Sequence, residues 1–148
     1  MNIAVIGTGM VGRLIAVELS KKYQVYAIDN NESNLDKLRK KNAKIITKKI
    51  DVKNEDFLKS LDDSDLIVNC VPGFMGFETS KKILEKKTCV DISFMPEDCN
   101  YLKTVAENAN TALYPDAGVA PGLSNMIVGN LISKNKLKEV KIMVGAYL

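Results

Sequence analysis

The residues most able to carry chemistry lie at the start of the chain. Residues 7–12 read Gly-Thr-Gly-Met-Val-Gly, the glycine spacing of a loop that turns tightly, approaches a pyrophosphate and opens a helix. Asp29 comes about 20 residues later, where a carboxylate accepts hydrogen bonds from the adenosine ribose. A ligand-free glycine turn would leave Asp29 unexplained, so we predict a dinucleotide site. Its expected contacts are Gly7, Gly9, Met10, Val11 and Gly12 to the phosphates, and Asp29 and Asn30 to the ribose.

These residues need a strand, a helix and a second strand to position them. Ile3 to Ile6 is short, apolar and β-branched, as a strand buried on both faces should be. Apolar residues then recur at helical spacing from Val11 to Leu19. Residues 25–28 form a second apolar run that ends just before Asp29.

Strands and helices continue to alternate along the chain, which predicts an α/β fold. We expect a doubly wound parallel sheet of the Rossmann type, with strand order 3-2-1-4-5-6 and helices on both faces. The remaining expected strands are 44–47, 66–70, 89–92, 111–114 and 140–144, and the remaining helices are 33–42, 54–61, 77–86, 96–109 and 123–132.

Loops at the carboxyl ends of the later strands supply further candidates, because ligands bind there in such sheets. Val71, Pro72 and Phe74 should line the nicotinamide side, although Phe74 is equally suited to covering the core. Asp51 and Val52 are placed beside the adenine, with a turn or cap as the alternative role of Asp51. Asp91 and Asp116 end two strands. As catalytic candidates one of them would bind a substrate ammonium or tune a proton transfer; as structural residues they would cap loop amides.

Asp29 also predicts the choice of cofactor. Its carboxylate would repel a 2′-phosphate, and no arginine follows it to hold one, so NAD is favoured over NADP.

The composition fits one ordinary globular domain of 148 residues with a net charge of +3. No apolar run reaches the roughly 18 residues that a membrane span needs, and the chain shows no signal-peptide pattern, so a cytoplasmic location is expected. Histidine is absent and the three cysteines lack metal spacing, so no metal site is expected. The basic stretch within 39–49 is better explained as a solvated helix end than as a nucleic-acid patch.

Four stretches resemble the lysine 6-dehydrogenase and saccharopine dehydrogenase family, in particular its archaeal L-lysine dehydrogenase members. They are residues 7–12, 72–77, 90–97 and 116–125. The resemblance implies an NAD-dependent oxidoreductase that takes hydride from the carbon–nitrogen group of lysine or saccharopine. It also implies a second α/β domain that holds the amino-acid substrate, supplies much of the acid–base chemistry and forms a homodimer.

Family enzymes are much longer than this chain. We therefore expect residues 1–135 to form the dinucleotide-binding domain and residues 136–148 to lead into a substrate domain that is absent here, whether this chain is a piece or a shortened relative. The chain alone should then be inactive. A stand-alone module that senses NAD(H), of the kind that gates potassium transporters, is the alternative, and a ligand-free structural protein is a third interpretation.

Overall fold

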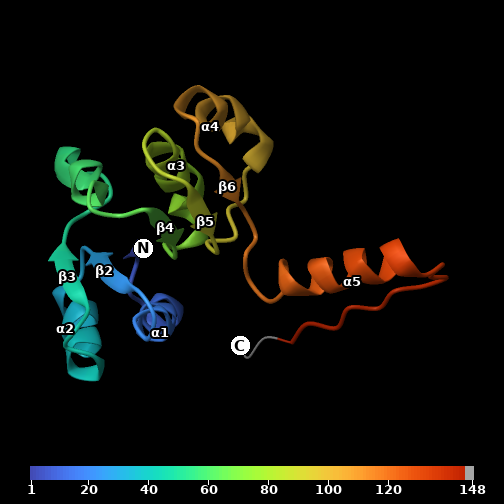
Figure 1. Ribbon diagram of the computed structural model, residues 1–148, viewed down its shortest axis with the longest axis horizontal. Helices are drawn as coiled ribbons and strands as arrows, with labels where there is room; N and C mark the ends of the chain where they lie inside the picture. Colours follow the sequence, from blue (N-terminus) through green and yellow to red (C-terminus); the bar gives the residue numbers. More distant parts are fainter. Residues whose placement is uncertain (146–148) are drawn as a thin grey trace.

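The computed structural model describes residues 1–145 and contains a parallel sheet of six strands (Figure 1). The strand order is β3-β2-β1-β4-β5-β6, so the predicted doubly wound topology is confirmed. The chain passes from β3, at one edge of the sheet, to β4, which pairs with β1 at the centre. The carboxyl ends of β1 and β4 therefore lie beside each other. The strands are β1 (Asn2–Ile6), β2 (Gln24–Asp29), β3 (Ile46–Lys49), β4 (Leu66–Asn69), β5 (Cys89–Asp91) and β6 (Leu113–Tyr114).

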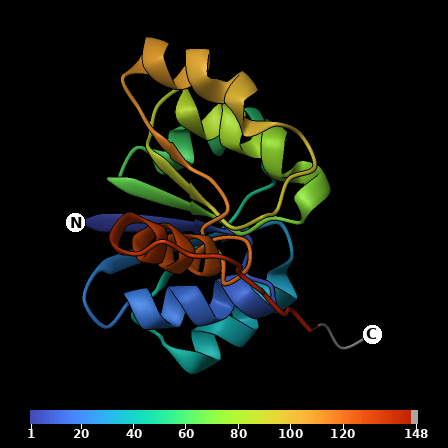
Figure 2. The same ribbon diagram turned by 90° about the vertical axis from the view of Figure 1, so that its right-hand side faces the viewer.

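Helices cover both faces of the sheet, as Figure 2 shows from the side. The first two helices lie on one face, and α3 and α4 lie on the other. The helices are α1 (Met10–Leu19), α2 (Glu32–Lys41), α3 (Gly73–Leu84), α4 (Lys103–Ala109) and α5 (Leu123–Lys134), with short 3₁₀ turns η1 (Glu55–Phe57), η2 (Lys59–Leu61) and η3 (Cys99–Leu102).

The core consists of two layers, one on each side of the sheet. Alternate side chains of β1 enter them, since successive residues of a strand face opposite sides. Val5 packs with Ala16 of α1 and Leu38 of α2, whereas Ile6 packs in the layer that contains Ile83 of α3. The buried β-branched strands therefore form a platform whose carboxyl edge holds the loops.

Several element bounds differ from the sequence prediction. The third strand begins at Ile46 rather than residue 44, and α3 begins at Gly73 rather than residue 77. The expected helix over 54–61 is two separate 3₁₀ turns. The Ser60 hydroxyl donates to the Phe57 carbonyl at 2.6 Å, a local bond that competes with a regular helix. Pro96 does not start a helix, because η3 begins at Cys99.

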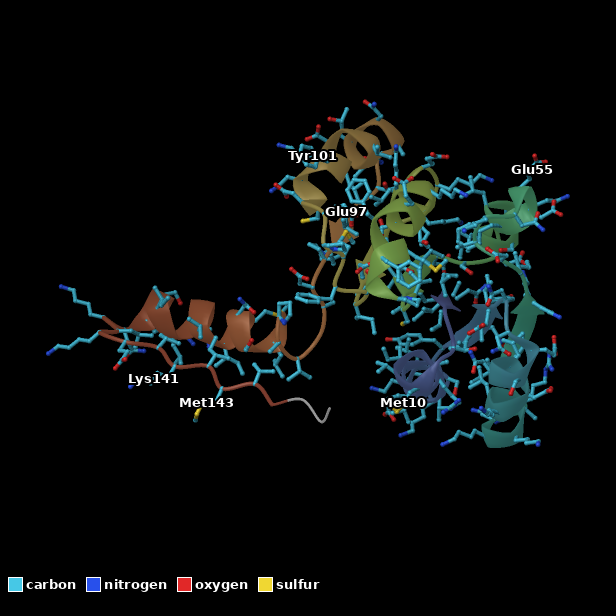
Figure 3. All side chains as sticks on the ribbon, turned by 180° about the vertical axis from the view of Figure 1, so that it is seen from behind. Met10, Glu55, Glu97, Tyr101, Lys141 and Met143 are labelled. Carbon is cyan, nitrogen blue, oxygen red and sulfur yellow. The ribbon has the colours of Figure 1, made fainter. Side chains whose placement is uncertain are left out.

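The carboxyl-terminal part stands away from the sheet. Helix α5 projects sideways and buries none of its residues (Figure 1). The following segment, which carries Lys141 and Met143, runs back along α5 (Figure 3). The prediction of a strand over 140–144 is wrong. Within the described residues this segment has no regular secondary structure and no strand to pair with. Among residues 1–145, no helix has the length and apolar character to cross a membrane.

Candidate dinucleotide-binding site

The glycine loop joins β1 to α1, and two of its glycines are required by close backbone contacts. Gly7 has φ +83°, and a Cβ there would lie 2.8 Å from the Cys70 carbonyl oxygen. A Cβ at Gly12 would collide with the Gly7 carbonyl oxygen. Gly9 differs, since a Cβ there would meet no atom within 4 Å. The absence of a side chain at Gly9 therefore leaves open space above the loop.

Helix α1 begins at this open space without a capping side chain. Gly9 is its N-cap residue, and the first turn contains no acidic side chain. The first N–H group of the helix that has a backbone acceptor is that of Arg13, which donates to the Gly9 carbonyl at 3.1 Å. The N–H groups before it are therefore available to a ligand. Figure 3 marks Met10 in this first turn. An uncapped helix start with its positive dipole end suits a pyrophosphate.

Asp29 lies at the end of β2 and is tied to the glycine loop. Its Oδ2 accepts the Thr8 N–H at 2.6 Å, the Thr8 hydroxyl at 2.9 Å and the Asn34 amide at 3.2 Å. Its Oδ1 accepts the Asn31 N–H at 2.8 Å. The side chain is nearly buried, yet it forms part of the cavity wall. The loop and the acid are thus one hydrogen-bonded unit.

The cavity has a volume of about 510 Å³ and lies over the carboxyl ends of the central strands. It brings together most of the residues predicted from the sequence, all five from the glycine loop among them. The predicted residues that line it are Gly7, Gly9, Met10, Val11, Gly12, Asp29, Asn30, Asp51, Val52, Val71 and Pro72. Phe74, Asp91 and Asp116 do not line it.

Asp51 and Asn30 form the rim of the cavity on the side of β3. The Asn30 amide donates to Asp51 Oδ2 at 3.1 Å, and the Lys53 N–H donates to Oδ1 at 2.9 Å. The Lys53 N–H, followed by the Asn30 amide, holds the pKa of the Asp51 carboxyl below its ordinary value. Lys82 of α3 also donates to the Val52 carbonyl at 3.1 Å, which fixes this turn.

Phe74 lies outside the cavity because α3 begins earlier than the sequence indicated. Within the first turn of α3 its ring points outward and is 80% exposed. The next residue, Met75, lines the cavity instead. The ring therefore does not cover the core, and its packing on the cofactor stays a prediction.

Asp91 lies beneath the loops in a closed hydrogen-bond network. Its Oδ2 accepts from Asn69 at 2.7 Å and Ser80 at 2.8 Å, and its Oδ1 accepts from the Ser93 N–H at 2.8 Å and hydroxyl at 2.7 Å. The residue is 1% exposed. These are the contacts of an acid that holds loop amides and hydroxyls, and its catalytic role stays a prediction.

Asp116 lies on an exposed loop with φ +53°, whereas Asp91 is buried. The loop is tied to β5 through the backbone, because the Ala117 N–H donates to the Asp91 carbonyl at 2.9 Å. The Asp91 carboxylate is thus enclosed in its hydrogen-bond network, whereas Asp116 is exposed, and neither residue lines the cavity. A catalytic role for Asp116 also stays a prediction.

Sequence reasoning missed several residues of the cavity wall. Asn34 lies one helical turn beyond the loop after β2, and this spacing was the available signal. Cys70 was considered as a possible metal ligand but not as part of the cavity wall. Burial raises its pKa to about 12, so the cavity wall there is a neutral thiol. The missed lining residues are Ile6, Ile28, Asn31, Asn34, Ile50, Cys70, Met75 and Ile92.

The residues present fit a dinucleotide. Open space above Gly9 and an uncapped α1 suit the pyrophosphate, and Asp29 suits a ribose. By contrast, no group of three or more metal-ligating side chains occurs within residues 1–145. Fold and cavity together define a dinucleotide-binding α/β domain of the Rossmann type.

The chain belongs to the family described as the saccharopine dehydrogenase NADP binding domain, whose model matches residues 3–120. This match confirms the resemblance to saccharopine dehydrogenases that the sequence motifs indicated. It also supports a nicotinamide dinucleotide as the cofactor. No curated protein sequence gives a significant match to the chain.

Solved structures show the same fold. Saccharopine dehydrogenase (L-Glu forming) from Saccharomyces cerevisiae is 20% identical with a TM-score of 0.79, over 90% of this chain and 31% of the yeast chain. An NAD-binding protein from Listeria innocua is 14% identical with a TM-score of 0.64, over 88% and 41%. Prephenate dehydrogenase from A. aeolicus, solved with NAD⁺, is 23% identical with a TM-score of 0.54, over 72% and 38%. The chain thus spans less than half of each of these relatives.

Proposed function

We propose that this chain is the cofactor-binding part of an NAD-preferring oxidoreductase that acts on the carbon–nitrogen group of an amino acid, of the lysine or saccharopine type. The cavity wall carries the main support for NAD. It contains the carboxylates of Asp29 and Asp51, and no lysine or arginine lines it within the described residues. A 2′-phosphate would therefore meet acids with no cation in the cavity wall itself, and the nearby Lys82 ammonium already donates to the Val52 carbonyl.

The roles of the residues follow from their positions. The N–H groups at the start of α1 hold the pyrophosphate, Asp29 holds the adenosine ribose, and the Asp51–Val52 turn lies beside the adenine. Val71, Pro72 and Met75 form the wall on the β4 side, where the nicotinamide is expected. When bound, the nicotinamide supplies the acceptor for a hydride.

The substrate and the partner belong to the same proposal. The family match and the likeness to a saccharopine dehydrogenase favour an amino-acid substrate. A second domain would close the cofactor against water, position that substrate and form a homodimer, since hydride transfer needs both reactants held in register. The chain spans 31% of the yeast enzyme, which leaves ample length for such a domain in a relative of that kind.

A titration of the purified chain with NADH and NADPH, followed by nicotinamide fluorescence, tests the cofactor. We expect NADH to bind at least about tenfold more tightly, because a doubly charged phosphate near one carboxylate costs about 1.4 kcal/mol or more. Asp29→Asn should reduce the preference for NADH over NADPH, since it removes the charge that repels the 2′-phosphate. Tighter binding of NADPH by the unaltered chain would overturn the proposal.

The substrate requires a second experiment with the complete gene product. Lysine and saccharopine are supplied with NAD⁺, and NADH formation is followed by the absorbance of the reduced nicotinamide. Oxidation of either supports the proposal. Tight NADH binding with no oxidation of either amino acid would favour the NAD(H)-sensing alternative.

A further inference from the structure

Thr8 occupies a position in the glycine loop where the glycine spacing itself demands no particular side chain. It is nonetheless fully buried. Both of its donors, the N–H and the hydroxyl, point to a single atom, Asp29 Oδ2, at 2.6 and 2.9 Å. This pair of bonds connects the phosphate loop directly to the acid at the end of β2.

The bonds divide the carboxylate into two unequal oxygens. Oδ2 accepts three hydrogen bonds, two from Thr8 and one from Asn34, which is more than the usual number for one oxygen, so no acceptor position is left on it. Oδ1 accepts only the Asn31 N–H within the described chain. Since a carboxylate oxygen accepts about two hydrogen bonds, one acceptor position is left, and it lies on Oδ1.

We propose that Thr8 is a positioning residue that fixes the Asp29 carboxylate with Oδ1 free for one ribose hydroxyl, and that it thereby sets the preference for NADH over NADPH. The inference rests on the proposed function and adds the residue that determines its specificity. Thr8 acts through Asp29 and does not itself touch the cofactor. Without its hydroxyl the carboxylate keeps the bonds from the Thr8 N–H, Asn34 and Asn31 but loses one of the three donors that hold Oδ2, so it can rotate away from the ribose more readily.

That rotation affects the two cofactors differently. NADH loses a hydrogen bond to a charged acceptor when Oδ1 turns away. NADPH carries a phosphate at the 2′ position, so the same movement removes a repulsion. A general loosening of the loop would instead weaken both cofactors alike, because both share the pyrophosphate.

The test compares Thr8→Val with Thr8→Ser in the purified chain, with NADH and NADPH titrated into each. Valine keeps the shape and the N–H but removes the hydroxyl donor, and serine keeps the donor. Thr111→Val is the matched control, because the Thr111 hydroxyl donates to the Leu84 carbonyl at 2.7 Å and lies outside the cavity. We expect the NADPH-to-NADH ratio of dissociation constants to fall about tenfold in Thr8→Val and to stay at the original value in the other two.

Two outcomes overturn the inference while the proposed function stands. In both, the unaltered chain prefers NADH, and Thr8→Val either keeps that preference or weakens both cofactors equally. If Thr8→Val does not fold, Thr8→Ala replaces it, because it also removes the hydroxyl donor to Asp29 Oδ2 and keeps the N–H. The ratio should then fall as in the valine variant, and an unchanged ratio overturns the inference. An unaltered chain that prefers NADPH instead contradicts the proposed function itself.

Discussion

Asp29 and Asp91 each end a parallel strand, one in each half of the sheet, and each accepts four hydrogen bonds. Their bonds are distributed differently. Asp91 accepts two on each oxygen, so its capacity is filled and it lies sealed at 1% exposure. Asp29 accepts three and one, which leaves one acceptor position in a side chain that lines the cavity. The same residue at equivalent positions thus holds loops in one half and is ready to bind a ligand in the other.

The largest effect is expected from Asp91→Asn. The new amide would place a donor against the buried donors of Asn69, Ser80 or Ser93, so at least one of them loses its acceptor. We expect the free energy of unfolding to fall by about 3 kcal/mol, measured by urea denaturation. Glu97→Gln is the matched control, since it removes the charge of an exposed carboxylate (Figure 3) and should cost less than about 0.5 kcal/mol. Equal stability of the two variants would contradict the structural role of Asp91.

Two glycines extend the comparison to the backbone. A Cβ at Gly73 would lie 2.8 Å from the Phe94 carbonyl oxygen, whereas a Cβ at Gly9 enters open space. Gly73→Ala should therefore lower the free energy of unfolding by about 1–3 kcal/mol, and Gly9→Ala by less than about 1 kcal/mol.

Binding should show the opposite order. Gly9→Ala places a methyl group where the pyrophosphate approaches, so we expect NADH binding to weaken about tenfold or more, measured by nicotinamide fluorescence. Gly73→Ala, measured at a temperature where it remains folded, should bind NADH within about twofold of the unaltered chain. A Gly9→Ala variant that binds NADH normally would show that the open space above the loop does not receive the phosphates.

The half of the sheet that contains β1, β2 and the expected ribose site was largely predictable from the sequence, because its signals are local. The strand, the glycine loop and the helix of residues 3–19 occur in one short run, and Asp29 follows at the expected distance. For this reason seven of the predicted contacts that line the cavity lie in the glycine loop or at the end of β2, namely Gly7, Gly9, Met10, Val11, Gly12, Asp29 and Asn30. The strand order also followed from the regular alternation of elements.

The half that contains β4, α3 and β5 was less predictable, because it depends on contacts between residues that lie far apart in the sequence. Gly73 and Gly76 look like loop residues, but α3 includes them because a bare backbone there packs on Ser93 and Phe94. Phe74 is turned outward as a result. The closure of Asp91 depends on Asn69 and Ser80, which come from another strand and a helix. Likewise, the β-branched residues within 140–144 have the composition of a strand, but this segment finds no strand partner within the described residues.

The smallest effect is a pH dependence that tests how dry the Asp91 half is. Cys89 lies beside Ser80 in that half. Burial raises the pKa of the Cys89 thiol to about 12. The Ser80 hydrogen bond acts to lower this pKa, and the charge of Asp91 acts to raise it. An unfolded thiol ionises near pH 9, so its contribution to stability is complete below pH 9 and is lost as the pH rises from 9 toward 12.

Between pH 8 and pH 10 the unaltered chain should therefore lose about 1 kcal/mol more of its free energy of unfolding than Cys89→Ala, which has no thiol there to ionise. Urea denaturation at the two pH values measures the difference, and Cys99→Ala, which keeps Cys89, should retain the loss due to that thiol. Equal losses in the unaltered chain and Cys89→Ala would mean that water reaches Cys89. Water could then also donate hydrogen bonds to Asp91. The contrast with Asp29 would rest on where each carboxylate lies, and no longer on how many of its acceptor positions are filled.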